Sequence, residues 1–176
     1  MADGTLKVGT ITTSSGSGTI TLGQSGETVN VSGTAGTGFG KVLQVVQTTK
    51  TNSFSTSSTS FVEVTGMNVS ITPSSTSNKI LVLMNASLGH GSGGTSAHVT
   101  LYRGATNLGH PSNGMNEVSD ANGSASFSGG VGISWLDSPS TTSSTTYTIY
   151  ARTGSGTAYF NNNSEYCSIT AIEVAN

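Results

Sequence analysis

Short alternating runs of apolar and polar residues constrain the fold of this chain more than any other feature. Val, Ile, Tyr and Phe stand among Thr and Ser in these runs, and no stretch sustains the 3.6-residue period of an amphipathic helix. β-Branched and aromatic residues in a period of two are typical of strands that are covered on one face. The sequence therefore predicts an all-β protein.

The expected strands are short, evenly spaced and separated by turn-rich connections. From Lys41 onward they fall at 41–50, 59–65, 67–72, 78–88, 96–103, 125–136, 145–152, 157–160 and 165–174. Such spacing is typical of β-sandwiches and barrels, and a jelly-roll-like β-sandwich is the first choice among them.

Two of these strands carry more specific expectations. Lys79–Met84 is apolar at successive positions, which predicts a central strand covered on both faces. In 165–174, Cys167 shares one face with Ile169 and Ala171, so the lone cysteine is expected in the core. The opposite face mixes Ser and Thr with Ile and Val, which predicts that a neighbouring subunit covers part of it.

The N-terminal part of the chain contains a sequence repeat with a period of nine residues. Similar four-residue units begin at Gly9, Gly18 and Glu27, and Gly/Ser-rich turns join them. Each unit offers one or two apolar residues, so three units cannot bury a core of their own. We expect this segment to need partners outside the chain.

A glycine-rich stretch at 33–40 separates this repeat from the expected sandwich. The interpretation is therefore an extended β arm at 1–40, for assembly and attachment, followed by a sandwich domain at 41–176. Within the arm, Ile11, Ile20 and Val29 are the candidate attachment residues.

The surface is expected to be neutral and rich in hydroxyl groups. Charged residues make up 8% of the chain, the net charge is -2, and Ser and Thr together account for about a third of the residues. Six scattered Lys and Arg provide no electrostatic footprint for nucleic acid. A surface with so little charge suits a part of an assembly better than a freely diffusing enzyme.

The sequence contains no complete motif for catalysis or cofactor binding. Gly89–Gly94 has the spacing of a dinucleotide fingerprint, but a strand pattern follows it where a helix is required. There is no Gly-x-Ser-x-Gly elbow, and the three histidines lack metal-ligand spacing. We expect no enzymatic activity, no cofactor and no bound metal.

Two sugar-directed alternatives remain open at this point. Glu117, Asp120 and Asp137 leave a glycosidic-cleavage pair possible on spacing alone, although eight acidic residues are few for such a groove. Trp135 and four tyrosines could form a stacking platform, but their strand positions favour a core or interface role; the tyrosines are Tyr102, Tyr147, Tyr150 and Tyr159.

The longest stretch without strand pattern is 104–124, and long loops on β scaffolds often carry function. It is either a surface loop that closes one end of the sandwich or a contact site. The candidate contact residues are His110, Asn113, Asn116, Glu117 and Asp120.

No membrane or secretory segment is expected. No charged-then-apolar leader follows Met1, and the longest apolar run, Ile80–Met84, is far too short to cross a bilayer.

Parts of the expected sandwich resemble a β module of surface proteins of tailed bacteriophages, particularly phages of aquatic bacteria. The resemblance is carried by Gly40–Gln47, Phe61–Pro73 and Asn78–Val82, and Cys167–Val174 is similar to the last strand of that module. It covers most of 40–176. It implies a virion-surface protein made in the host cytoplasm, usually a homotrimer, with no agreed catalytic residues.

Within a virion, two uses compete. A decoration or cement protein needs a compact globule and an arm that grips neighbouring capsid subunits, and the two-part layout matches this need. A short tail fibre or receptor-binding protein, which would contact tail components and a host-surface glycan, normally needs a longer shaft and is the alternative. The sequence favours a trimeric capsid decoration protein bound to the major capsid protein.

Overall fold

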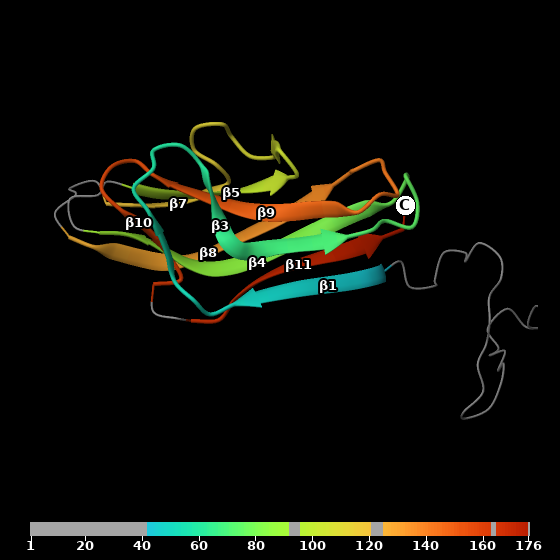
Figure 1. The fold of residues 1–176 in the computed structure, drawn as a ribbon, viewed down its shortest axis with the longest axis horizontal. Helices are drawn as coiled ribbons and strands as arrows, with labels where there is room; N and C mark the ends of the chain where they lie inside the picture. Colours follow the sequence, from blue (N-terminus) through green and yellow to red (C-terminus); the bar gives the residue numbers. More distant parts are fainter. Residues whose placement is uncertain (1–41, 92–95, 121–124, 163–164, 176) are drawn as a thin grey trace, which may run out of the picture. The chain divides into compact units, whose positions relative to one another are not determined.

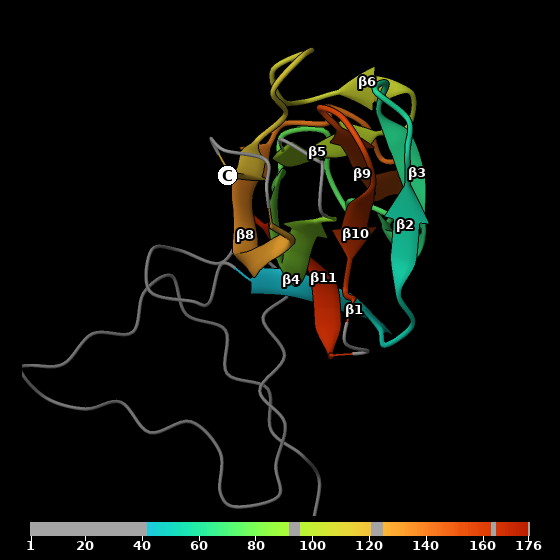
Figure 2. The same ribbon diagram turned by 90° about the vertical axis from the view of Figure 1, so that its left-hand side faces the viewer.

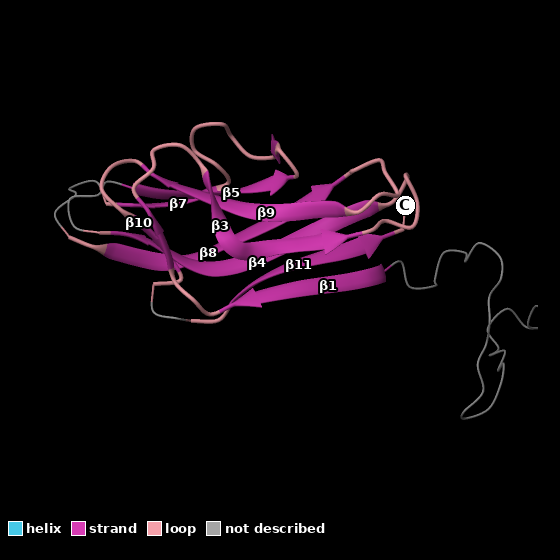
Figure 3. Cartoon of the chain, in the orientation of Figure 1, coloured by secondary structure: helices cyan, strands magenta, loops and turns pink. Residues whose placement is uncertain are grey.

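The computed structural model describes residues 42–91, 96–120, 125–162 and 165–175. The proposed arm at 1–40, its hinge and the attachment residues Ile11, Ile20 and Val29 lie outside these described residues. Within them the regular structure consists of strands (Figure 3). The expectation of an all-β domain is confirmed.

The larger sheet contains four long strands and two short ones (Figure 1). The first strand pairs with the last, the last pairs with β4, and β4 pairs on its other side with β8. A short strand, β10, continues beside the end of β4 and pairs with β2. The bounds are β1 (Val42–Lys50), β2 (Phe54–Thr56), β4 (Lys79–His90), β8 (Phe127–Asp137), β10 (Ala158–Phe160) and β11 (Cys167–Val174).

The smaller sheet has the order β3-β9-β5, and the short strands β6 and β7 both pair with the free side of β5. Every pairing in both sheets is antiparallel. The two sheets pack face to face as a β-sandwich, and Figure 2 views the two layers from one end. The bounds are β3 (Val62–Ile71), β5 (Ser96–Arg103), β6 (Thr106–Asn107), β7 (Asn116–Ser119) and β9 (Thr145–Thr153).

Most of the strands pair in a nested order. β1 pairs with β11, β3 with β9, β4 with β8, and β5 with β7. Strands from the two ends of the described chain therefore lie side by side, while the innermost pair is separated only by β6 and its connections.

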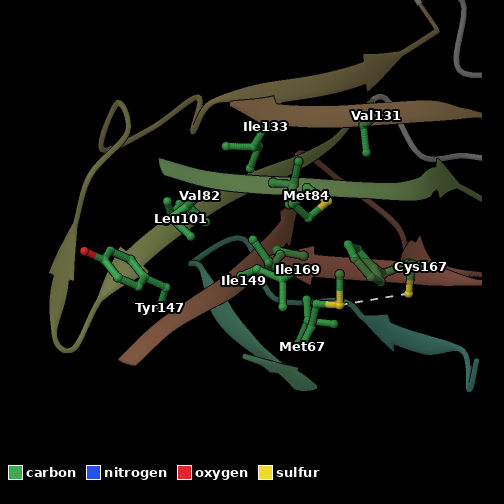
Figure 4. Close-up of a cluster of buried hydrophobic side chains, with 14 of the residues drawn as sticks. Met67, Val82, Met84, Leu101, Val131, Ile133, Tyr147, Ile149, Cys167 and Ile169 are labelled. Atoms are coloured by element: carbon green, nitrogen blue, oxygen red, sulfur yellow. Dashed lines mark hydrogen bonds between the residues drawn. The ribbon is translucent and has the colours of Figure 1, made fainter. Parts of the chain in front are cut away.

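The core lies between the sheets and receives alternate residues of the long strands (Figure 4). Cys167, Ile169 and Ala171 are buried, as their shared face predicts. The Cys167 thiol donates to the Lys50 carbonyl at 3.0 Å and lies 4.0 Å from the Met67 sulfur on the opposite sheet. The prediction that the cysteine is a core residue is confirmed.

Two predicted strands, 59–65 and 67–72, are one strand in the structure. β3 runs without a break from Val62 to Ile71, and its pairing with β9 shifts register between Glu63 and Asn68. Gly66, with φ of 79°, lies inside this irregularity. A glycine adopts this backbone conformation readily, so it bends the strand where a turn was expected.

The stretch 104–124 is not wholly irregular, contrary to expectation. It contains β6 and β7, which extend the smaller sheet beyond β5. The three-residue strand β2 is a further addition. Strands of two to four residues are too short to display an alternating pattern, and only their pairing partners define them.

The expectation that β4 is covered on both faces is wrong for this chain alone. The strand is central, and Ile80, Val82 and Met84 point into the core. On the other face Leu81 is half-buried and Leu83 is 38% exposed. The described part of the chain thus covers one face of β4 and leaves the other open.

Candidate functional site

A row of four aliphatic residues crosses the outer face of the larger sheet. The register places Val45 of β1 opposite Ile172 of β11, Ile172 opposite Leu81 of β4, and Leu81 opposite Leu136 of β8. Val45 is 59% exposed and Leu136 is 54% exposed, while the two central residues are half-buried. We call these four residues the aliphatic row.

The surroundings of the aliphatic row are almost free of charge. Val42, Val174 and Leu83 flank it, and the next positions along the strands carry Gln, Thr and Ser. By register, Lys79 is the one charged residue on this face of β1, β11, β4 and β8, and its ammonium group donates to Ser138 Oγ at 3.0 Å. An apolar, uncharged sheet face of this kind is typical of a surface that another protein covers.

A polar cleft of about 490 Å³ lies toward the other end of the same sheet. Its floor comes from β4 and β8, where Ser87 pairs with Gly130, and Glu165 and Tyr166 line it from the segment before β11. The full lining is Asn85, Ala86, Ser87, Ser128, Gly129, Gly130, Asn162, Glu165 and Tyr166. Sequence reasoning missed this cleft.

A smaller hollow of about 100 Å³ adjoins the cleft and shares Ser128 and Asn162 with it. His90, which is 1% exposed, lines this hollow together with Phe127 and Tyr159. The His90 ring contacts the Gly91 carbonyl through Nδ1 at 3.2 Å. Its Nε2 atom has no hydrogen-bond partner among the described residues.

The candidate contact residues of the 104–124 stretch separate into two groups. His110 holds a local turn, because its Nδ1 accepts hydrogen bonds from the backbone N–H groups of Ser112 and Asn113 at 3.2 and 3.1 Å. Asn116 and Glu117 belong to β7, and the Asn116 amide donates to the Gly132 carbonyl of β8 at 3.2 Å. Asp120 follows directly after β7.

Asn113 and Glu117 meet at His98 of β5, which the sequence did not connect with them. His98 Nδ1 lies 3.2 Å from the Glu117 carboxylate and 3.3 Å from the Asn113 carbonyl. Burial lowers the pKa of His98, and the Arg152 charge lowers it further against the opposing effects of Glu117 and Asn113. Neutral His98 therefore ties β5, β7 and their connection together.

Asp137, considered above as a member of a possible catalytic carboxylate pair, is buried, and its carboxylate is hydrogen-bonded to other side chains. It accepts hydrogen bonds from Arg103 at 2.8 and 2.9 Å and from the Tyr147 hydroxyl at 2.6 Å. Burial, followed by the hydrogen bond to Asp137, raises the pKa of Tyr147. This cluster joins the edge of the larger sheet to the smaller sheet.

The five aromatic residues do not form one row. Tyr147 is fully buried, which confirms a core role for that residue, and Tyr102 stacks on Tyr150 with ring centroids 3.9 Å apart. Trp135 is on the inward side of β8 but is partly exposed at the sheet edge.

In the described ranges no three or more His, Cys, Asp or Glu side chains gather in a way that could hold a metal ion. The same residues include no helix with the length and hydrophobicity needed to cross a bilayer. Comparison with protein-family models and with curated proteins finds no match to the chain.

Proposed function

We propose that this protein is a non-enzymatic structural protein of a bacteriophage virion, and specifically a trimeric capsid decoration or cement protein. The observation that carries the proposal is the aliphatic row on a nearly uncharged sheet face. A free protein gains nothing from such a face, whereas a subunit of an assembly gains hydrophobic burial from it. The resemblance of most of 40–176 to phage surface modules supplies the virion context.

The order of strand pairing supports a jelly-roll fold. Four nested antiparallel pairs, with the first strand beside the last, are what results when one long hairpin is wound into two sheets. Jelly rolls are common in viral capsid proteins and in lectins. The fold is therefore compatible with a place on a particle surface.

Charge favours further copies of this chain as the partner that covers the aliphatic row. A strongly charged partner would bury unpaired charges against aliphatic side chains, which is costly. A second and a third copy would bring the same nearly uncharged face, from a chain with only 8% charged residues. Three copies around a three-fold axis would bury all three rows together.

Light scattering of the purified full-length protein, together with its copy number in purified particles, tests the proposal. We expect a mass three times the 17.7 kDa of one chain. We also expect hundreds of copies per particle, as a head protein requires; a few trimers per particle would instead indicate the tail. A folded monomer at micromolar concentration that does not trimerise on the particle would overturn the proposal.

A further inference from the structure

We infer that the polar cleft between β4, β8 and the segment that leads into β11 binds a neutral saccharide. This inference goes beyond the proposed assembly function and does not depend on it. It concerns the end of the larger sheet opposite Leu136, where polar residues and glycines replace the aliphatic row.

The size and polar lining of the cleft fit a short oligosaccharide. Its volume of about 490 Å³ lies within the range of about 300–1,000 Å³ that is usual for small-molecule sites. The side chains of Asn85, Asn162, Ser87 and Ser128 give it two amides and two serine hydroxyls, and these groups can both donate to and accept from sugar hydroxyls. Ser168 donates to the Asn85 amide oxygen through its N–H and its hydroxyl, at 3.1 and 3.0 Å, so the Asn85 NH2 group is the donor that a ligand can meet.

Tyr166 gives the cleft an apolar surface for stacking. It is 84% exposed, so the described part of the chain gains little from burying its ring. An aromatic ring beside convergent polar groups is the usual combination in a site for an amphipathic ligand such as a sugar ring.

Glycines on β8 keep the floor of the cleft open. Gly130 faces Ser87 in the pairing with β4, and a Cβ atom added to Gly130 would meet nothing within 4 Å. A side chain at this position would therefore project into the space that a ligand would occupy. The strand conformation itself does not require glycine there, because Gly130 does not have a positive φ.

The charge of the lining selects neutral sugars. Glu165 is the one charged residue among the lining residues, and it can accept hydrogen bonds from hydroxyls. The same carboxylate repels sialic and uronic acids. We therefore expect neutral hexose and N-acetylhexosamine units, and no preference for acidic glycans.

The test is a screen of the full-length protein on an array of neutral and acidic oligosaccharides of two to four sugar units, followed by calorimetric titration of the best ligand. We expect the bound glycans to be neutral. Tyr166→Ala removes the stacking ring and Gly130→Val fills the floor, so each should weaken binding at least tenfold. Thr65→Val, which places a valine at an exposed position of the smaller sheet, should bind like the wild type.

Absence of binding on the array, binding confined to acidic glycans, or unchanged affinity in Tyr166→Ala would overturn the inference. Thermal melts followed by circular dichroism accompany each variant. If Gly130→Val does not fold, Tyr166→Ala decides the question, because the exposed ring does not contribute to the core. Light scattering of the same samples separates the two proposals: a trimer that binds no glycan contradicts only this inference, and a monomer that binds glycan contradicts only the proposed assembly.

Discussion

A single buried carboxylate, that of Glu173, anchors one end of the sandwich. Glu173 lies on the inward face of β11 and is 1% exposed. It accepts hydrogen bonds from the Ser74 N–H and hydroxyl at 2.6 and 2.7 Å, from Asn78 at 2.7 Å and from Gln44 at 3.2 Å. The carboxylate therefore ties the turn before β4, and also β1, to the last strand.

This environment predicts a specific dependence of stability on pH. Burial alone would raise the pKa of Glu173, but the hydrogen bonds from Asn78, Ser74 and Gln44 outweigh it, so the pKa lies below its ordinary value of 4.5. The resulting stabilisation is complete above the unfolded-state pKa and is lost as the pH falls through the lower, folded-state pKa. We expect Glu173→Gln to lower the free energy of unfolding by about 1–3 kcal/mol at pH 7.

Urea unfolding at pH 7 and at pH 3 measures this effect. The difference between wild type and Glu173→Gln should shrink at the lower pH, because below its ordinary pKa the carboxylate takes up a proton more readily in the unfolded state than in the folded state. Equal stability of the two proteins at pH 7 would contradict the assigned role.

Gly114 is a second residue whose identity the fold requires. It has φ of 69°, and an added Cβ would collide with the carbonyl oxygen of Val99. We expect Gly114→Ala to destabilise the protein by more than about 2 kcal/mol, through both the collision and the unfavourable backbone conformation. Gly130→Ala is the matched control and should change stability by less than about 0.5 kcal/mol. Thermal denaturation of the two variants tests this prediction. Similar melting temperatures for Gly114→Ala and Gly130→Ala would contradict it.

Among the elements, the long strands were predictable and the short ones were not. The stretches that became β1, β4, β5, β8, β9 and β11 are eight or more residues long, so an alternating pattern or, in β4, a continuous apolar run is visible in the sequence. A glycine at position 66 is typical of a turn in the sequence. Only the pairing of β3 with β9, which shifts register between Glu63 and Asn68, shows that it lies in a bent strand. The inward position of Glu173 follows from the strand alternation, because it lies two residues after the buried Ala171. Its hydrogen-bond partners could not be predicted, because they come from segments distant in sequence.

The aliphatic row gives the element-scale prediction. Leu136→Asp would place a charge in the proposed contact between subunits, where an unpaired charge costs several kcal/mol. Leu136 is more than half exposed in the single chain, so the domain itself should remain folded. We expect the trimer to dissociate, as measured by light scattering, with little change in the melting of the monomer.

Thr65→Asp is the control for that experiment, because Thr65 is exposed on a strand of the other sheet. It should leave the trimer intact. A Leu136→Asp protein that still forms trimers would remove the aliphatic row from the assembly surface.

At the scale of the whole molecule, the cleft could not be found from sequence. Its lining comes from β4, from β8 and from three residues between β10 and β11. No local motif joins these segments, and the register between β4 and β8 is what brings Ser87 opposite Gly130. The β-sandwich class could be predicted because it depends on the apolar and polar pattern of each strand. The cleft could not be predicted because it depends on which strands pair and in what register.

The arm prediction also belongs to this scale. The buried core residues described lie between Val64 and Ala171, so a chain that starts at Lys41 should keep a cooperative melt close to that of the full chain. We expect the truncated protein not to bind to phage particles. The combined change of Ile11, Ile20 and Val29 to Asp should also prevent binding of the full-length protein. Quantitative mass spectrometry of particles is the measurement. Normal occupancy by either variant would show that the sandwich itself makes the attachment.

The nested pairing has a consequence for how the protein is made. β11 lies between β1 and β4, so the larger sheet has a gap at its centre until residues 167–174 have left the ribosome. Pairings between segments so distant in sequence raise the contact order, and β proteins of high contact order fold in about milliseconds to seconds. β1 therefore stays without its partner while β3–β9, β4–β8 and β5–β7 can already pair, and the larger sheet is completed only when β11 is available.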